Sequence, residues 1–348
     1  MKYKGKLSDI PPPVKYMEES IRKIAMGFER SQILFTAFEL GFFEKLKEPI
    51  TAEAFVGMTG YNEAVSSRML DILTAMDFLH KIHDKYCLNP DYVPFLVKGE
   101  DYYSYYLENA VKERNLWNDL KSCLVNETPP AEEKTKFNYS TESIRWTARD
   151  CTHGRLQRTI QLVSSFPEFE TACRLLDLGG GHGLFGIGFA QENPDLEVII
   201  FDRPEVSVVA EEFIDDFNVN NQVFFVSGDY MIDNFGTGYE IIFEALSLEG
   251  GFDEAKKLYE KVSEALVPNG LFITQLFTID DLQTSPLSTL TLDLRERITN
   301  NKQLHLMTNT ELFKLFENCG LLGEQIINIS MGENLPLRMI VARKVSSD

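Results

Sequence analysis

One short stretch of the chain decides its fold: Leu175-Leu176-Asp177-Leu178-Gly179-Gly180-Gly181-His182-Gly183. An apolar run that ends in a series of glycines predicts a buried β-strand that turns sharply into a helix. Glycine tolerates positive φ and lets a ligand approach the backbone closely. Ligands of open α/β sheets bind at the carboxyl ends of the strands. We therefore expect a ligand-binding loop at the end of this strand.

Strand-like and helical runs alternate after this stretch. The first strand is expected over residues 174–178, and further strand-like runs follow at residues 196–201, 222–226, 240–246 and 271–276. This alternation predicts an α/β fold with a parallel, doubly wound sheet and right-handed crossovers. The last two apolar runs, at residues 325–329 and 337–343, are joined by a short loop and predict an antiparallel hairpin at one edge of the sheet.

The acid at the end of the first strand indicates the kind of ligand. Gly181, Gly183 and Gly186 formally match a dinucleotide-binding fingerprint, but that match alone is weak. A carboxylate such as Asp177 repels a pyrophosphate and attracts a cation. The pattern Asp177-x-Gly179-x-Gly181-x-Gly183 therefore suits S-adenosylmethionine, whose methionyl part carries an ammonium and a sulfonium group.

The next two strands also end near acidic residues. Asp202 closes the second strand, where a carboxylate accepts hydrogen bonds from ribose hydroxyls. Asp229 and Tyr230 follow the third strand; we expect Asp229 to bond the adenine amino group and Tyr230 to stack on the ring. Acids at three successive strand ends predict a bound nucleoside with a cationic tail.

The first hundred residues show a different pattern. A helical run covers residues 31–46, and Gly41 is expected to kink or cap it. Thr51 opens a short helix, and Asn62 is suited to N-cap a third helix. Two strand-like runs, at residues 79–82 and 86–88, then flank a turn. Three helices followed by a hairpin predict a winged-helix domain.

Charge excludes several classes of partner. The chain has 34 Lys+Arg against 53 Asp+Glu, a formal net charge of −19, so it repels phosphate backbones. The would-be recognition helix carries Arg68 against Glu63, Asp71 and Asp77, and we expect no binding to nucleic acid.

No long apolar run or signal peptide is present, so no membrane contact is expected. Five scattered cysteines predict free thiols, no metal site and a cytoplasmic protein.

The chain resembles the S-adenosylmethionine-dependent O-methyltransferases, a family that includes plant caffeic acid and animal hydroxyindole O-methyltransferases. The resemblance rests on residues 37–43, 50–53, 177–183, 201–204, 228–229 and 264–270. It implies a class I methyltransferase Rossmann-like sheet over residues 170–348, a winged-helix dimerisation domain over residues 1–98, and a helical connector over residues 99–169 that contributes to the acceptor pocket. It also implies a homodimer, a small-molecule methyl acceptor, and cofactor contacts from Gly179, Asp202, Asp229 and Tyr230.

The catalytic position departs from the family pattern. In the plant enzymes a histidine after the fourth strand removes the acceptor proton, whereas counting forward from that strand gives Glu249 here, and counting back from residue 264 gives Leu248. Three interpretations stay open. Glu249 is a base whose pKa is raised by burial, the acceptor needs no base, or the fold binds the cofactor without transferring its methyl group. The acceptor atom can accordingly be O, S, N or C.

Other side chains are candidates for contact with the acceptor. His153 lies in a segment that aligns with the family helix lining the acceptor pocket, and His305 lies close to the second catalytic segment of the family. If two arginines converged near these segments, they would favour an anionic acceptor; the candidates are Arg149, Arg155, Arg295 and Arg297.

Overall fold

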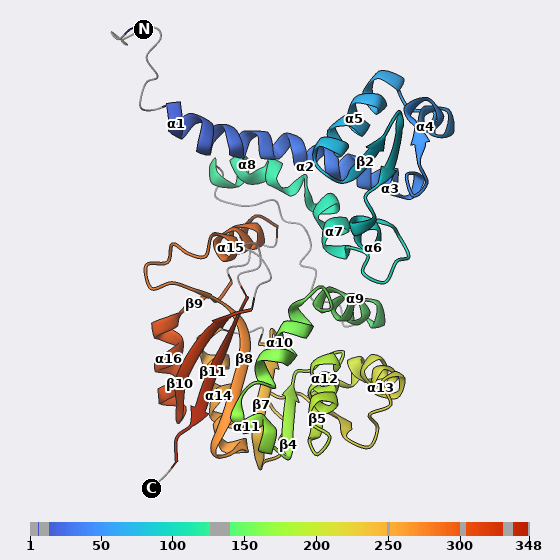
Figure 1. Ribbon diagram of the computed structural model, residues 1–348. Coiled ribbons are helices and arrows are strands. Elements are labelled where there is room, and N and C mark those ends of the chain that lie inside the picture. The colour runs from blue at the N-terminus through green and yellow to red at the C-terminus, as the bar shows by residue number, and fades with distance from the viewer. Residues whose placement is uncertain are drawn as a thin grey trace. The chain divides into compact units, whose positions relative to one another are not determined.

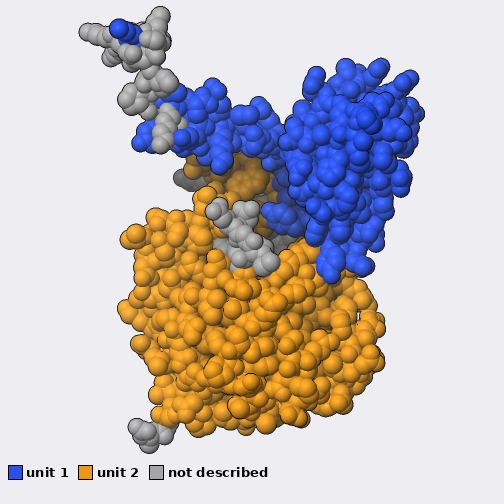
Figure 2. Space-filling view, in the orientation of Figure 1, with its two compact units in different colours: residues 1–114 blue, residues 115–348 orange. Residues whose placement is uncertain are grey.

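The computed structural model describes residues 6, 14–125, 140–248, 251–299, 304–329 and 337–346. Contacts between residues divide the chain into two compact units, Met1–Arg114 and Asn115–Asp348, which Figure 2 shows in blue and orange. Each unit has its own buried core. The three-part division at residues 98 and 169 stays a prediction.

Unit 1 consists of short helices and a small antiparallel sheet with the strand order β1-β3-β2. Its elements are α1 (Val14–Tyr16), a π-helical turn (Met17–Arg22), α2 (Lys23–Glu39), α3 (Phe42–Lys45), β1 (Ile50–Thr51), α4 (Ala52–Thr59), α5 (Glu63–Ala75), β2 (Leu79–Ile82), β3 (Lys85–Leu88), a 3₁₀ turn (Pro90–Tyr92), α6 (Val93–Leu96) and α7 (Tyr105–Glu113). Helices followed by the β2–β3 hairpin confirm the predicted pattern.

Capping explains where the helices of unit 1 begin. The Ala54 N–H donates to the side-chain oxygen of Thr51 over 3.1 Å, and the Val65 N–H donates to Asn62 Oδ1 over 3.0 Å. Both predicted N-caps are therefore confirmed. The helical run expected over residues 31–46 is interrupted at Gly41 as predicted, because Gly41 adopts φ 64° and separates α2 from α3.

The hairpin of unit 1 is tied to α5 through an acid. Asp71 accepts hydrogen bonds from the Tyr86 hydroxyl over 2.7 Å and from Lys81 Nζ over 3.0 Å. These bonds hold the pKa of Asp71 below its usual value.

Unit 2 is built on a mixed sheet with the strand order β10-β11-β8-β7-β4-β5-β6, to which β9 (Met307–Thr308) adds beside β8 (Figure 1). The strands are β4 (Arg174–Leu178), β5 (Glu197–Asp202), β6 (Val223–Ser227), β7 (Tyr239–Ala245), β8 (Leu266–Ile279), β10 (Leu321–Asn328) and β11 (Leu337–Lys344). Strands β8, β7, β4, β5 and β6 are parallel, and β11 and β10 are antiparallel at one edge. The predicted α/β fold and its terminal hairpin are confirmed.

Helices cover both faces of this sheet. The helical segments of unit 2 are a 3₁₀ turn (Leu116–Asp119), α8 (Leu120–Val125), α9 (Thr141–Cys151), α10 (Arg155–Val163), α11 (Pro167–Thr171), α12 (Leu184–Glu192), a 3₁₀ turn (Pro204–Val206), α13 (Ser207–Asp216), α14 (Phe252–Ala265), α15 (Leu287–Thr299) and α16 (Asn309–Asn318). One core packs α9 to α12 on the sheet, and the other packs α14 and α16. Burial on both faces explains the nearly continuous apolar sequence of the central strands.

Candidate functional site

A cavity of about 310 Å³ lies at the carboxyl ends of β4 and β5 and beside the end of β7. It brings together Asp177, Gly179, Gly181, Asp202 and Tyr230, which the sequence proposed as one site. The remaining residues on its lining are Ile144, Thr147, Arg155, Gly180, His182, Phe185, Arg203, Val206, Ala245, Leu246 and Ser247. Gly183 and Asp229 do not line it.

At Gly179 and Gly183 the glycine loop is packed so closely that a side chain has no room. A Cβ on Gly179, which has φ 66°, would lie 2.3 Å from Ser247 Cβ. A Cβ on Gly183, which has φ 75° and begins α12, would lie 2.7 Å from Ile200 Cδ1. Gly183 therefore serves the turn into the helix, whereas Gly179 brings backbone to the cavity wall.

Asp202 closes the loop from the neighbouring strand. The Gly181 N–H donates to Asp202 Oδ2 over 2.7 Å, and the Arg203 N–H donates to Oδ1 over 2.6 Å. Burial raises the pKa of Asp202, and the two amides act in the opposite direction. Since a carboxylate oxygen accepts more than one hydrogen bond, both oxygens keep capacity for hydroxyl groups in the cavity.

Asp177 lies beneath the same loop and is almost fully buried. Its Oδ2 accepts a hydrogen bond from the Gly186 N–H over 3.0 Å. Burial raises the pKa of Asp177 to about 7, against the lowering effect of that amide. A cation placed in the cavity would favour the charged form of this carboxyl group.

The third strand end contributes Tyr230 but not Asp229. The Tyr230 hydroxyl donates to the backbone oxygen of Ser247 and so connects the segments that follow β6 and β7. The Asp229 carboxylate accepts from the Met231 N–H over 2.9 Å and thereby shapes the turn that presents Tyr230.

Arg155, at the start of α10, adds a cationic group to the cavity lining. Its guanidinium carbon lies 5.3 Å from the centre of the Phe185 ring, and its Nη1 atom is buried without a hydrogen-bond partner in the described part of the chain. A buried cationic donor of this kind suits an anionic group of a ligand. From the sequence, Arg155 is a candidate only for an anionic acceptor, and its position on this cavity depends on how α10 packs beside the glycine loop.

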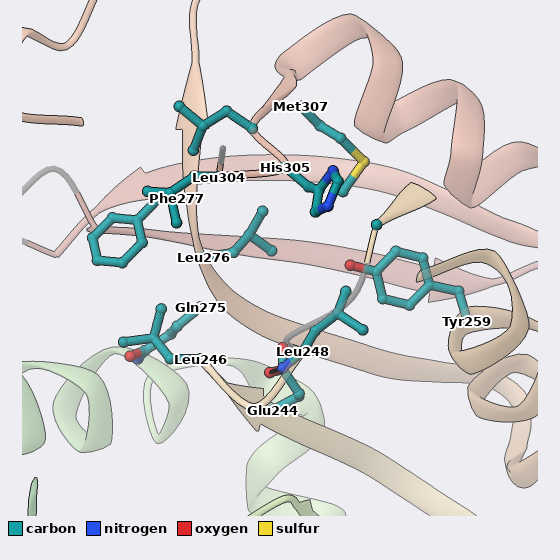
Figure 3. A pocket seen from close by; sticks show the side chains of 12 residues that line it. Glu244, Leu246, Leu248, Tyr259, Gln275, Leu276, Phe277, Leu304, His305 and Met307 are labelled. Atoms are coloured by element: carbon teal, nitrogen blue, oxygen red, sulfur yellow. Dashed lines mark hydrogen bonds between the residues drawn. The ribbon is translucent and has the colours of Figure 1, made fainter. Parts of the chain in front are cut away.

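A second cavity, of about 250 Å³, lies next to the first, and Leu246 lines both. Its lining, shown in Figure 3, consists of Glu244, Leu246, Leu248, Gly251, Tyr259, Gln275, Leu276, Phe277, Leu304, His305, Leu306 and Met307. Figure 3 shows the Tyr259 ring with its hydroxyl group directed toward this space. The cavity is mostly apolar.

The candidate acceptor-binding residues have different positions. His305 lines the second cavity and is exposed, and Leu248 lines it as well. His153 lies in the turn after α9 and lines neither cavity. Glu249 lies outside the described residues. The arginines do not converge: Arg297 pairs with Asp293 of its own helix over 2.7 Å, and Arg149, Arg295 and Arg297 line neither cavity.

In the described ranges of the chain, no three His, Cys, Asp or Glu side chains gather closely enough to hold a metal ion. No helix in these ranges combines the length and apolar content that a bilayer-spanning segment needs.

Both units match models of O-methyltransferase domains. The model of the O-methyltransferase domain matches residues 140–320, and that of the O-methyltransferase dimerisation domain matches residues 23–93. An uncharacterized protein of Methanocaldococcus jannaschii is 30% identical over 280 residues, which cover 77% of this chain and 73% of that protein. The N,N-dimethyltransferase OxyT of Streptomyces rimosus is 24% identical over 299 residues, which cover 81% of this chain and 83% of OxyT.

Solved structures share the fold. The structure of human N-acetylserotonin methyltransferase in complex with SAM matches with a TM-score of 0.70 at 21% identity and covers 97% of this chain and 99% of that one. The pyocyanin biosynthetic protein PhzM matches with a TM-score of 0.75 at 19% identity and covers 94% of this chain and 99% of PhzM. Another match, PigF, contains SAH.

Proposed function

The chain belongs to the O-methyltransferase family, for which the cofactor is S-adenosylmethionine, and we propose that it transfers the methyl group of this cofactor to a small molecule. The observation that carries the proposal is the cavity at the ends of β4 and β5, where Asp177, Asp202 and Arg155 meet around a glycine loop. These groups have the charges that the parts of the cofactor need.

Each charged group suits one part of the cofactor. The Asp202 carboxylate has capacity left for the two ribose hydroxyls, and Asp177 provides a negative charge for the ammonium group. Arg155 suits the cofactor carboxylate, because its buried Nη1 has no partner in the described part of the chain. We assign Tyr230 to the adenine ring, and Asp229 to the adenine amino group if the turn holding it adjusts.

When bound, S-adenosylmethionine supplies a methyl group on a positively charged sulfur, which a nucleophile displaces in line. The chain contributes mainly alignment of the two reactants. The second cavity is the place we propose for the acceptor, because it adjoins the first at Leu246. We propose O-methylation, with Glu249 as the group that removes the proton and His305 and His153 as the other candidates.

A second candidate reaction uses an acceptor that is already nucleophilic at S, N or C. Leu248, one of the two positions that correspond to the family histidine, places an apolar side chain in the second cavity. A leucine accepts no proton, so an acceptor that needs no base suits this lining. A role in cofactor binding without methyl transfer remains the third interpretation.

We also propose a cytoplasmic homodimer that binds neither nucleic acid nor a membrane. The dimerisation-domain match over residues 23–93 supports pairing of two chains. All five cysteines are free thiols, which suits a reducing compartment.

Calorimetric titration with S-adenosylhomocysteine tests the site. Asp202→Ala removes two charge-assisted hydrogen bonds to the ribose, each worth about 1.5–3 kcal/mol, and is expected to weaken binding at least about tenfold. Asp216→Ala removes the same charge from an exposed position near the end of α13 and should leave affinity unchanged. Equal affinity of Asp202→Ala and the unmodified chain would contradict the proposed site.

A further inference from the structure

Glu244, at the end of β7, is a buried carboxylate without a cationic partner. It is 2% exposed, and it forms no salt bridge with any described residue. Its Oε1 accepts from the Ser247 N–H over 2.6 Å, from Ser247 Oγ over 2.7 Å and from the Leu248 N–H over 3.3 Å. Its Oε2 accepts one hydrogen bond, from the Thr274 hydroxyl. Burial raises the pKa of Glu244 despite these hydrogen bonds, so a cation in the cavity would favour its charged form.

The neighbouring strand β8 adds an unsatisfied acceptor to the same cavity. Gln275 is fully buried, and its Nε2 donates to Thr159 Oγ1 over 2.6 Å. Its Oε1 has no hydrogen-bond partner in the described part of the chain, and neither has the buried hydroxyl of Tyr259. An unpartnered buried acceptor costs free energy that a donor on a ligand recovers. The cavity therefore favours a ligand that brings N–H groups.

The other lining residues of the second cavity limit the polarity and the charge of the ligand that fits it. Leucine, phenylalanine and methionine side chains form most of the lining, and no lysine or arginine is among the described residues that line it. Among these described residues, the exposed His305 is the one nitrogen base. An anionic ligand would face Glu244 at low dielectric with no strong countercharge, whereas an apolar body with a cationic end would match both kinds of surface.

We propose that the second cavity binds an apolar amine, with its ammonium group facing Glu244 and one N–H donated to Gln275 Oε1. That this amine is the methyl acceptor rests on the function proposed above; its binding does not. The polar residues on which this proposal rests are Glu244, Gln275 and Tyr259. None of them was predicted from the sequence as a site residue.

Three probes with one ring system and different end groups test the charge preference: naphthylmethylamine, naphthylmethanol and naphthoate. Each is titrated calorimetrically into the full chain near neutral pH, with and without S-adenosylhomocysteine. We expect the amine to bind at least about tenfold more tightly than the alcohol, as one charge-assisted hydrogen bond predicts, and naphthoate to bind most weakly. The inference is overturned if naphthoate equals the amine, if the alcohol equals the amine, or if no probe binds at millimolar concentration.

Substitutions test whether Glu244 causes the preference for the amine probe. Glu244→Gln removes the charge and is expected to reduce amine affinity to that of the alcohol, whereas Glu260→Gln, on the exposed side of α14, removes an equal charge outside the cavity and should change nothing. Unchanged amine affinity in Glu244→Gln would overturn the inference. If this variant does not fold, Leu248→Lys supplies a cation inside the cavity and should reverse the order, so that naphthoate binds better than the amine. An unreversed order in Leu248→Lys would also overturn it.

The titrations keep this inference separate from the proposed function. Binding of S-adenosylhomocysteine without any preference for the amine contradicts the amine site alone. Preference for the amine without any binding of S-adenosylhomocysteine contradicts the proposed methyltransferase function and leaves the amine site in place.

Discussion

Gly179 shows how a single residue fixes the shape of the proposed cofactor cavity. Its φ of 66° is left-handed, and a Cβ there would lie 2.3 Å from Ser247 Cβ and 2.6 Å from Ser247 Oγ. The sequence predicts the need for glycine from the strand-to-helix turn. The sequence does not predict that Ser247 is the residue packed against Gly179, because the two are brought together only by the pairing of β7 with β4.

Substitution of this glycine therefore affects binding more than folding. Gly179→Ala is expected to push the loop from the end of β7, at a strain of about 1–3 kcal/mol, and to weaken S-adenosylhomocysteine binding at least about tenfold in calorimetry. Gly57→Ala is the matched control: it lies in α4, where a Cβ would have open space, and should raise stability by up to about 1 kcal/mol without changing affinity. Wild-type affinity in Gly179→Ala would show that the loop does not hold the cofactor.

At the scale of elements, local signals identified most helices and strands. The caps at Thr51 and Asn62 and the apolar runs from β4 to β11 lie close to where the sequence places them. The break at Gly41 is also expected from the sequence, whereas β8 extends from Leu266 to Ile279, beyond the predicted run over residues 271–276.

The second cavity and its lining residues could not be predicted from the sequence. It depends on the register between β7 and β8, which sets Glu244 opposite Thr274 and Ala245 opposite Gln275. Periodicity predicts which strands exist but not which residues of two strands lie opposite each other. Arg155 and Thr159, the residue to which Gln275 donates, both lie on α10, and periodicity does not predict which residues of a helix face a given strand.

His182 joins the turn between β4 and α12 to helix α9. Its Nδ1 accepts from the Leu184 N–H over 3.1 Å, and its Nε2 lies 3.7 Å from Cys151 Sγ. Burial, and secondarily Arg155, lower the pKa of His182 to about 3. The imidazole is therefore neutral at physiological pH, and the bond to Nδ1 places its proton on Nε2.

This histidine predicts a stability difference that depends on pH. A depressed pKa means that the unfolded chain takes up a proton below about pH 6.5 while the folded chain does not, so the contribution of His182 is present above that pH and is lost as pH falls toward about 3. The unfolding free energy of the unmodified chain relative to His182→Asn should fall by about 1.4 kcal/mol between neutral pH and one unit below pH 6.5. Urea denaturation of both proteins at a series of pH values measures this difference in unfolding free energy. If the difference does not vary with pH, a neutral, buried His182 is contradicted.

At the scale of the whole molecule, one feature of unit 1 is unusual for a chain with a net charge of −19. Met17, Ile21, Ile24 and Phe28 recur every three or four positions along the π-helical turn and α2, and all are exposed. Apolar side chains at this spacing form one stripe, and stripes of this kind mark surfaces that another protein covers. The dimerisation-domain match begins at residue 23, within this region, so a second copy of the chain is the partner we expect.

Charge placed on this stripe should separate the two copies. Ile24→Glu combined with Phe28→Glu puts two carboxylates where apolar area is buried on pairing, and a charge at such a position costs several kcal/mol, so we expect sedimentation velocity to show a monomer. Arg30→Glu also adds negative charge to the exposed surface of α2, but at a position outside the stripe, and should sediment like the unmodified chain. The dimer is contradicted if the unmodified chain sediments as a monomer, and the stripe is contradicted as its interface if the double variant stays dimeric. Because both cavities lie within unit 2, the double variant should still bind S-adenosylhomocysteine, which distinguishes lost pairing from lost folding.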